Sequence, residues 1–355
     1  MKELNPMPRV SIILLNWNGL DDTLECLGTI CRSDYPNYDI IVVDNCSTDD
    51  SIKTIFQKFP QVFLIKNSIN LGYTGGNNIA MRYAVEHDTD YVWLLNNDTV
   101  VETDTLSKIV ATAERDPAIG MVSPLVYFYG EPDVIQFCGS QIDWESASIS
   151  PFSDPQSYEK NKNKPISLWG TALLIKRDVV EKIGYLDDKF FAYGEDEDYS
   201  IRVIRAGFRN EVQIYAKIHH KDSRSTGGRQ SPLQVFLRLR NRYFIWSDKL
   251  RGVEKLNFMR RYLAFAISNI AEFKRMNLNE AVDAGLGGIW AALNNKGGPW
   301  ERSLTMPAWF KAVFIPVCSW HPYLWCRLLN GEGSKIMAEV AKRLLKRKGM
   351  QINER

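Results

Sequence analysis

Four short apolar runs near the N-terminus constrain the fold of this chain more than any other feature. They cover residues 10–15, 38–43, 62–65 and 91–95. Their β-branched and aromatic residues are typical of buried strands. Apolar residues at helical spacing fill the intervals and predict helices over residues 21–31, 51–59 and 77–87. Strands and helices that alternate in this way predict an α/β domain with a mostly parallel, Rossmann-like sheet flanked by helices.

Polar side chains follow three of these runs directly. The residues at the three strand ends are Asn16 and Asn18, Asp44 and Asn45, and Asn96 and Asp98. Ligands of open α/β sheets bind beyond the carboxyl ends of the strands, so we expect a polar binding site at this edge. Asp98 is suited to hold Mg²⁺ or Mn²⁺, because these cations prefer oxygen ligands. An ordinary strand-ending turn is the alternative for each cluster alone.

Four consecutive acids at residues 195–198 begin a predicted helix that runs to residue 206. Acids at a helix start suit the helix dipole, but four exceed what capping needs. Helical spacing puts Glu195 and Asp198 on one face and turns Asp196 elsewhere. Clustered carboxylates repel one another, and the raised pKa that results suits a general base. We therefore expect the four acids to have different tasks.

Two further segments are candidates for ligand contact. The glycine-dense residues 71–78 are typical of a loop that enters a helix and approaches a phosphate or ribose, although a tight turn explains them equally well. His219 and His220 follow a predicted strand over residues 212–218 and stand beside Lys221. They are candidates for metal or diphosphate contact, with a structural histidine at a strand end as the alternative.

Length and composition limit the remaining choices. The 355 residues exceed one average domain, so we predict an α/β domain over residues 1–230 and a helical C-terminal region over 231–355. A net charge of +2 argues against a nucleic-acid partner. Six scattered cysteines, no signal-peptide pattern and no apolar run of about 20 residues predict a cytoplasmic protein. Residues 145–166, rich in Ser, Pro, Asn and Lys, are predicted to form a mobile loop.

The C-terminal region combines basic and aromatic stretches. Residues 221–261 hold eleven Lys/Arg and three acids, and residues 342–348 are basic again. Residues 309–326 are aromatic and apolar, although Pro316 and Pro322 interrupt them. This pattern predicts peripheral contact with a membrane, at the inner face of the plasma membrane for a cytoplasmic protein. A helical cap on the first domain, or a homodimer contact, is the alternative.

Taken jointly and in order, these segments resemble glycosyltransferase family 2, the inverting enzymes with a GT-A fold. The resemblance is closest to the rhamnosyltransferase-like bacterial branch that builds surface polysaccharides of the cell envelope. The matching segments are residues 10–19, 42–51, 70–78, 95–98, 169–172, 191–198, 220–223 and 240–243. Each segment alone is weak, but their number and order make the match specific.

The resemblance implies a role for individual residues. A nucleotide-sugar donor, dTDP- or UDP-linked, would contact Asn16, Asn18, Asp44, Asn77, Asn96, Asn97, Trp169 and Gly170. Asp98 would hold the divalent metal on the diphosphate, with His220 completing the metal or diphosphate contacts. Asp196 would deprotonate the hydroxyl of a glycan or lipid-linked acceptor, with Glu195 and Asp198 in support. The reaction would be a single displacement that inverts the anomeric carbon, with rhamnose from dTDP-rhamnose as the best match.

Two residues depart from the family pattern. Asn96 stands where the usual Asp-x-Asp has its first acid, and Asn77 stands where many members have Arg. Galactosyl, glucosyl or N-acetylhexosaminyl transfer from a UDP-sugar is one alternative. A nucleotidyltransferase is another, but residues 15–20 lack the basic loop that it needs. The acids at 195–198 argue against a third alternative, a non-catalytic carbohydrate-binding protein.

Overall fold

The structure is a computed structural model that describes residues 7–221, 231–301 and 306–320. These residues divide into two compact units. We call residues 7–221 with 297–299 the sheet unit, and residues 231–296, 300–301 and 306–320 the helical unit. The predicted domain boundary at residue 230 and the basic residues 342–348 lie outside the described part of the chain. Within that part, no helix has the length and apolar character needed to span a membrane.

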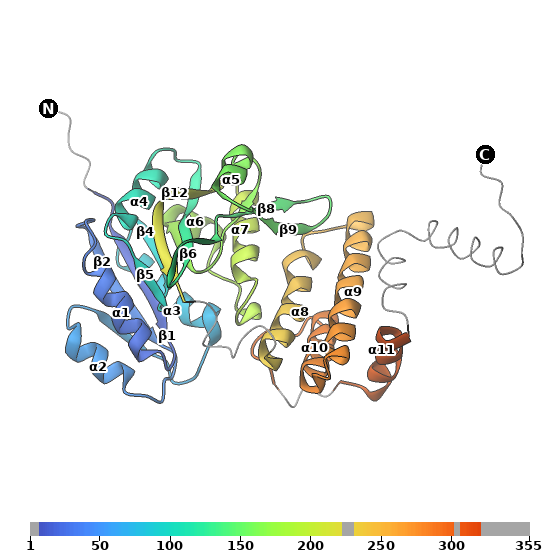
Figure 1. Ribbon diagram of the computed structural model, residues 1–355. Coiled ribbons are helices and arrows are strands. Elements are labelled where there is room, and N and C mark those ends of the chain that lie inside the picture. The colour runs from blue at the N-terminus through green and yellow to red at the C-terminus, as the bar shows by residue number, and fades with distance from the viewer. Residues whose placement is uncertain (1–6, 222–230, 302–305, 321–355) are drawn as a thin grey trace, which may run out of the picture. The chain divides into compact units, whose positions relative to one another are not determined.

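A nine-stranded sheet organises the sheet unit (Figure 1). Its strand order is β3-β2-β1-β4-β11-β6-β12-β5, and β7 pairs with β6. The bounds are β1 (Val10–Asn16), β2 (Tyr38–Asp44), β3 (Phe63–Lys66), β4 (Tyr91–Asn96), β5 (Thr99–Val101), β6 (Ile119–Phe128), β7 (Glu131–Phe137), β11 (Ala172–Lys176) and β12 (Arg209–His220). The first four strands in this order are parallel, whereas β11 runs antiparallel to β4. The predicted α/β sheet is confirmed: the four apolar runs form four neighbouring parallel strands, and β12 also pairs in parallel with β6.

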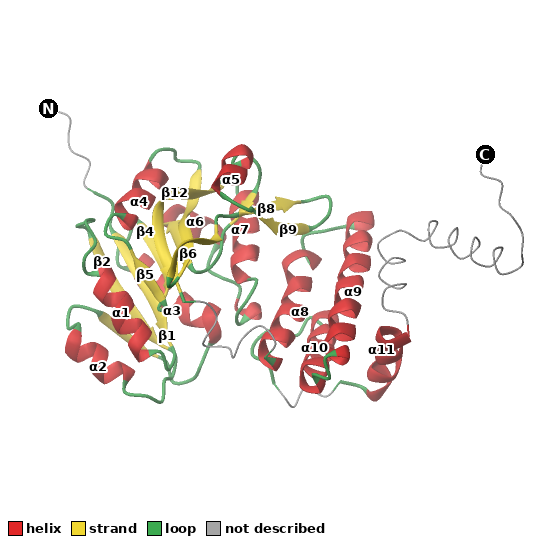
Figure 2. Cartoon of the chain, in the orientation of Figure 1, coloured by secondary structure: helices red, strands yellow, loops and turns green. Residues whose placement is uncertain are grey.

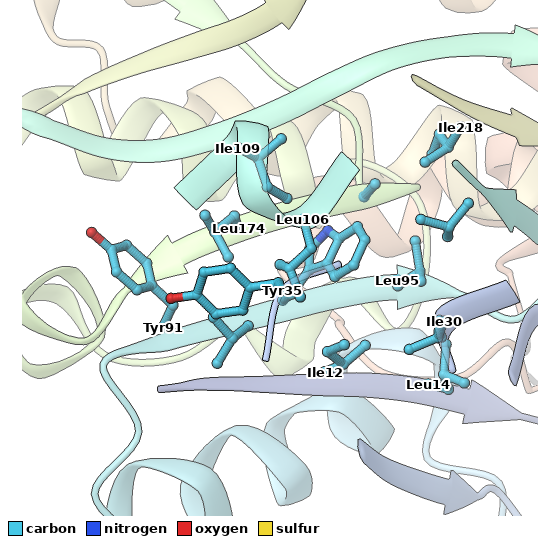
Figure 3. Close-up of a cluster of buried hydrophobic side chains, with 14 of the residues drawn as sticks. Ile12, Leu14, Ile30, Tyr35, Tyr91, Leu95, Leu106, Ile109, Leu174 and Ile218 are labelled. Atoms are coloured by element: carbon cyan, nitrogen blue, oxygen red, sulfur yellow. The ribbon is translucent and has the colours of Figure 1, made fainter. Parts of the chain in front are cut away.

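Helices cover both faces of this sheet. They are α1 (Leu20–Ile30), α2 (Ser51–Lys58), α3 (Gly72–Glu86), α4 (Thr105–Glu114), α6 (Arg177–Ile183) and α7 (Glu195–Arg205), with a 3₁₀ turn at Asp188–Phe190. Side chains alternate along β1, so that Ile12 and Leu14 pack with α1 and α4 on one face (Figure 3). Ile13 packs with α3, α6 and α7 on the other. Two apolar cores therefore hold the central strands, and the polar residues at the ends of β1, β2 and β4 lie outside both cores.

Residues 145–166 form ordered secondary structure, so the predicted mobile loop is wrong. A small second sheet contains β8 (Ser140–Asp143), β9 (Ser148–Pro151) and β10 (Ile166–Ser167), and α5 (Pro155–Asn161) lies within this stretch of chain (Figure 2). Asp154 caps α5 by accepting from the Ser157 backbone N–H, and Pro155 suits the first helical position. Tyr158 is 1% exposed. One buried aromatic ring and a good cap therefore outweigh a composition that is typical of loops.

The helical unit contains α8 (Pro232–Ser247), α9 (Gly252–Arg275), α10 (Asn279–Leu293) and α11 (Ala308–Trp320), which confirms the predicted helical extension. An apolar core from all four helices includes Leu239, Ile270, Leu286 and Phe310. Gly288 brings α10 close to α8, because a Cβ there would lie 2.4 Å from the Phe236 carbonyl oxygen. Small residues thus set the spacing of these helices.

Candidate active site

The ends of β1 and β2 form a polar cluster around the Asp44 carboxylate. The Asn16 amide donates to Oδ1 of Asp44 at 3.0 Å, and the Ser47 N–H donates to Oδ2 at 3.0 Å. The Ser47 hydroxyl in turn accepts from the backbone N–H of Asn18 at 2.9 Å. Asn18 has a positive φ of 51°, which an Asn tolerates better than most residues. The structure therefore brings Asn16, Asn18 and Asp44 together, and Ser47, which the sequence analysis gave no role, joins them.

The end of β4 and the end of β12 form a second cluster. Nε2 of His220 lies 3.2 Å from Oδ1 of Asp98 and 3.5 Å from Nδ2 of Asn96. Nδ1 of His220 lies 2.8 Å from Oε1 of Gln136, at the end of β7. Because an amide oxygen only accepts, Nδ1 of His220 carries the hydrogen in this pair. Gln136 therefore fixes the tautomer of His220, a role that no sequence pattern near residue 136 indicated.

This second cluster has donors that suit a divalent metal ion. The hydrogen on Nδ1 leaves Nε2 of His220 facing the Asp98 carboxylate, and an imidazole nitrogen and a carboxylate oxygen are both ligands that a divalent metal accepts. Adjacent ligands of an octahedral Mg²⁺ with bonds of about 2.1 Å lie about 3 Å apart, close to the 3.2 Å observed. Among the described residues, however, no three His, Cys, Asp or Glu side chains gather in one group. Among the described residues, Asp98 and His220 are therefore the two candidate ligands for a divalent metal at this strand end.

The acidic helix α7 divides its carboxylates as its spacing predicts. Glu195 and Asp198 are 5% and 2% exposed, whereas Asp196 is partly open to solvent. Asp198 pairs with Arg202 at 2.8 Å, and the same guanidinium donates to two backbone carbonyls. Asp198 thus contributes to the structure around the helix. Oε2 of Glu195 is buried without a hydrogen-bond partner among the described residues.

The pKa values of Glu195 and Asp196 are both raised. Burial raises the pKa of Glu195 well above its usual range, and the neighbouring Asp196 charge raises it further. Burial also raises the pKa of Asp196, while the backbone N–H groups of Gly170 and Glu197 oppose that shift. The N–H of Gly170 donates to Oδ2 of Asp196 at 2.8 Å. Asp196 is therefore a partly exposed carboxylate held in one orientation, with the raised pKa that general-base catalysis favours.

The segment 169–171 links the acidic helix to the end of β4. Gly170 contacts Asp196 as described, and the next residue, Thr171, accepts from the Asn96 N–H at 2.9 Å. Trp169 stacks on Phe137 with ring centroids 4.1 Å apart. The carboxylate of Asp196 and the cluster at the end of β4 are therefore joined through two adjacent residues, Gly170 and Thr171.

Two more predicted site residues have defined places. The Asn97 amide donates to the Thr23 hydroxyl at 2.8 Å, and this hydroxyl donates to Oδ1 of Asn16 at 2.9 Å, which connects the first two clusters. Asn77 is 2% exposed, and its amide donates to the Tyr73 carbonyl inside α3. Among the described residues, no hydrogen bond joins the Asn77 side chain to these clusters. Its predicted contact with the nucleotide stays a prediction.

Comparison with known proteins identifies the family of this chain. Residues 11–184 match the model of glycosyl transferase family 2. The low-salt glycan biosynthesis hexosyltransferase Agl10 of Haloferax volcanii is 25% identical over 238 residues, which cover 66% of this chain and 74% of that protein. The N-acetylglucosaminyl-diphospho-decaprenol L-rhamnosyltransferase of Mycobacterium tuberculosis is 25% identical over 236 residues, which cover 60% of this chain and 76% of that protein.

Solved structures show the same fold. TarS 1-349 of S. aureus, in complex with UDP-GlcNAc, superposes with a TM-score of 0.55 at 14% identity, covering 97% of this chain and 93% of that one. This chain spans 54% of a longer TarS structure. The family match and the relatives identify a glycosyltransferase, and the sheet with its flanking helices has the GT-A fold. The chain belongs to glycosyl transferase family 2.

Proposed function

We propose that the protein transfers a sugar, with rhamnose from dTDP-rhamnose as the preferred donor, to a hydroxyl of a glycan or lipid-linked acceptor. One observation carries the proposal: two adjacent residues hold both parts of the site, since Gly170 donates to the Asp196 carboxylate and Thr171 accepts from the N–H of Asn96, at the end of β4. The proposed proton acceptor and the strand end that leads to Asp98 are thus connected through two adjacent residues. The rhamnosyltransferase named among the relatives supports the choice of sugar and of a lipid-linked acceptor.

The proposed reaction is a single displacement. The acceptor oxygen forms a bond to the anomeric carbon, the bond from that carbon to the donor diphosphate breaks, and Asp196 takes the hydroxyl proton. Attack from the face opposite the leaving group inverts the configuration. Asp44 contacts the base or ribose of the donor, and Asn16, Asn18 and Asn97 shape that pocket. Trp169 and Gly170 border the sugar and the acceptor.

Asp98 and His220 would hold Mg²⁺ or Mn²⁺ at the diphosphate end of this pocket. A bound metal ion would neutralise charge on the departing diphosphate. Gln136 orients His220. Asn96 places a neutral amide near His220, whereas an acid at this position would add a negative charge. The protein thus supplies two ligands and leaves the rest to the diphosphate and water.

Product analysis tests the proposed donor. The purified protein with Mn²⁺ and a prenyl-diphosphate-linked N-acetylglucosamine acceptor is offered dTDP-rhamnose, UDP-galactose, UDP-glucose or UDP-GlcNAc. We expect transfer from dTDP-rhamnose above the other donors, with an inverted anomeric configuration by NMR. Faster transfer from a UDP-sugar would replace the donor assignment, and binding of every donor without transfer would favour a carbohydrate-binding protein.

We also propose a peripheral membrane contact through α11. Trp309 and Val313 lie one helical turn apart and are 60% and 59% exposed, whereas Phe310 is buried in the core of the helical unit. An exposed aromatic and apolar stripe, followed in sequence by the basic residues 342–348, suits an anionic lipid surface. The acceptor of a lipid-linked reaction lies at that surface.

Vesicle flotation tests the membrane contact. The double variant Trp309→Ala/Val313→Ser should float less with anionic vesicles than the original protein. Phe56→Ser in α2, which removes an equally exposed ring from the sheet unit, is the control and should not change flotation. Equal flotation of all three proteins would contradict the proposal. A smaller particle in light scattering, seen only for the double variant, would instead assign the stripe to a homodimer.

A further inference from the structure

The first turn of α3 contains the glycine-dense residues that the sequence analysis considered for phosphate contact. The structure gives their backbone N–H groups to protein acceptors instead. The Leu71 N–H donates to Oδ1 of Asn45 at 3.0 Å, and the Gly72 N–H donates to Oδ1 of Asn70 at 2.8 Å. The Thr74 N–H donates to the Phe191 carbonyl at 3.1 Å. Three backbone donors at the start of α3 are therefore already engaged within the protein.

We propose that this turn positions the catalytic base, and that Tyr73 does so by holding Gly170 against Asp196. The inference rests on the proposed role of Asp196 as that base. Tyr73 is a positioning residue here, because it acts on Asp196 through another residue. The hydroxyl of Tyr73 donates to the Gly170 carbonyl at 2.6 Å, and the Gly170 N–H donates to Asp196 at 2.8 Å.

Gly170 is held at both of its polar backbone groups by these two contacts. A Cβ at this position would lie 3.1 Å from the Tyr73 hydroxyl and 3.6 Å from Cβ of Asp196, so the three residues pack at close range. Burial raises the pKa of Tyr73 well above its usual range, and the Glu195 and Asp196 charges raise it further, so the hydroxyl keeps its proton and stays a donor. A rotation of Gly170 would therefore break two hydrogen bonds at once.

The same turn of α3 also holds the chain that leads into the acidic helix. Gly72 has a φ of +72°, and a Cβ there would lie 2.4 Å from the Phe191 carbonyl oxygen. That oxygen accepts from the backbone N–H of Thr74. Phe191 and Tyr193 both have positive φ, at 65° and 67°, conformations that persist only where the surroundings hold them. The start of α7 is thus held from the Phe191 side as well as from Gly170.

The turn also connects the base to the donor side of the site. The Asn45 amide donates to the Gly72 carbonyl at 3.1 Å and to Oδ1 of Asn70 at 2.9 Å, and Asn45 directly follows Asp44. One rigid turn therefore joins the strand end that bears Asp44 to the two segments that flank Asp196. This continuity suits a reaction in which donor and acceptor must meet in a fixed geometry.

Tyr73→Phe tests the proposal, because it removes the hydroxyl and keeps the ring. We expect kcat to fall about tenfold while the KM for the donor stays within about twofold, since a slightly misplaced base loses rate and not binding. The weakened Gly170 N–H contact should raise the pKa of Asp196, so the acidic limb of the kcat–pH profile should move to higher pH. The other acids beside Asp196, at residues 195, 197 and 198, are unchanged in this variant. A purely structural role of Tyr73 would not move that limb.

Tyr199→Phe is the matched control. Tyr199 is a buried tyrosine on α7 whose hydroxyl donates to another glycine carbonyl, that of Gly184, at 3.0 Å. The Tyr199→Phe variant should lower thermal stability about as much as Tyr73→Phe does. It should leave kcat and the acidic limb of the kcat–pH profile unchanged. If Asp196→Asn abolishes transfer but Tyr73→Phe behaves like this control, the inference is wrong and the proposed base stands. If Asp196→Asn keeps full transfer activity, the proposed base fails, and the inference fails with it.

Discussion

The site has two sides that are built differently. On the base side, Asp196 receives backbone hydrogen bonds from Gly170 and Glu197, and the flanking chain is bound to α3. On the metal side, Asp98 and His220 face each other with Gln136 behind the imidazole. Hydrogen bonds within the protein orient the proposed base, whereas the described residues offer two candidate metal ligands, Asp98 and His220. In the proposed mechanism, the protein therefore fixes the direction of attack and the donor diphosphate completes the metal site.

Asp196→Asn should have the largest effect, because it removes the proposed base and keeps the shape of the side chain. We expect kcat to fall by about 10²–10⁴, the usual contribution of a general base. Donor affinity, measured by calorimetry, should not change. Glu197→Gln, which removes one charge from the same helix turn, is the control and should keep most of the activity. Equal losses of kcat in the two variants would mean that the total negative charge at the start of α7, and not Asp196 itself, supports the reaction. The contrast between the two sides of the site would then fail.

Asp98→Asn should have the next largest effect. Removing the carboxylate that faces His220 should lower kcat/KM about a hundredfold at low Mn²⁺, in line with the several kcal/mol that a bound cation contributes. High Mn²⁺ should restore part of the activity, whereas it should not rescue Asp196→Asn. Asp104→Asn, which removes an exposed carboxylate that pairs with Lys108, serves as the control. Metal-independent activity in the original protein would mean that basic groups, and not a cation, meet the diphosphate.

Gln136→Ala should have a smaller effect on the same side. Loss of the acceptor behind His220 should weaken Mn²⁺ binding about tenfold, as for other residues that orient metal-bound histidines. Electron paramagnetic resonance of Mn²⁺ with the protein and dTDP measures this affinity without turnover. Gln136→Glu keeps an oxygen acceptor and should retain more affinity than the alanine variant. Equal affinity in all three proteins would show that Gln136 has no part in metal binding.

Sequence reasoning predicted the parallel half of the fold and the strand-end residues well, because both depend on local patterns. An apolar run that ends in Asn or Asp identifies a buried strand and its exit, and helical spacing at residues 195–198 separated Asp196 from its buried neighbours. The family resemblance then assigned roles that spacing alone left open.

The remaining contacts depend on residues far apart in the sequence. Gln136 meets His220 across 84 positions, and Tyr73 meets Gly170 across 97. Neither pair has a local pattern, since a Gln at a strand end and a Tyr in a first helical turn are both ordinary. The glycines of residues 71–78 did carry a signal of close approach. The approach is to Phe191, and at Gly76 to Leu15 of β1, so the pattern indicated tight packing but not its partner.

Glu195→Gln should have the smallest effect on activity and a clear effect on stability. The pKa of Glu195 is higher in the folded protein than its ordinary value of 4.5, which applies to the unfolded chain. At a pH between these two pKa values, the native state holds a proton that the unfolded state has lost. Stability contributed by this group therefore falls as pH rises through that window. The glutamine variant cannot ionise, so it should lose less stability than the original protein when the pH is raised from about 5 to about 8.

Urea unfolding at both pH values measures this difference, and Glu181→Gln, a change at an exposed acid, should follow the original protein. Parallel stabilities for Glu195→Gln and the original protein would mean that Glu195 is charged in the folded state beside Asp196. The base side would then carry two adjacent charges instead of one. The distinction matters for the comparison, because a neutral Glu195 leaves Asp196 as the one carboxylate of this pair that can accept a proton. A charged Glu195 would offer the acceptor hydroxyl two bases, and the contrast between a defined base and an incomplete metal site would weaken.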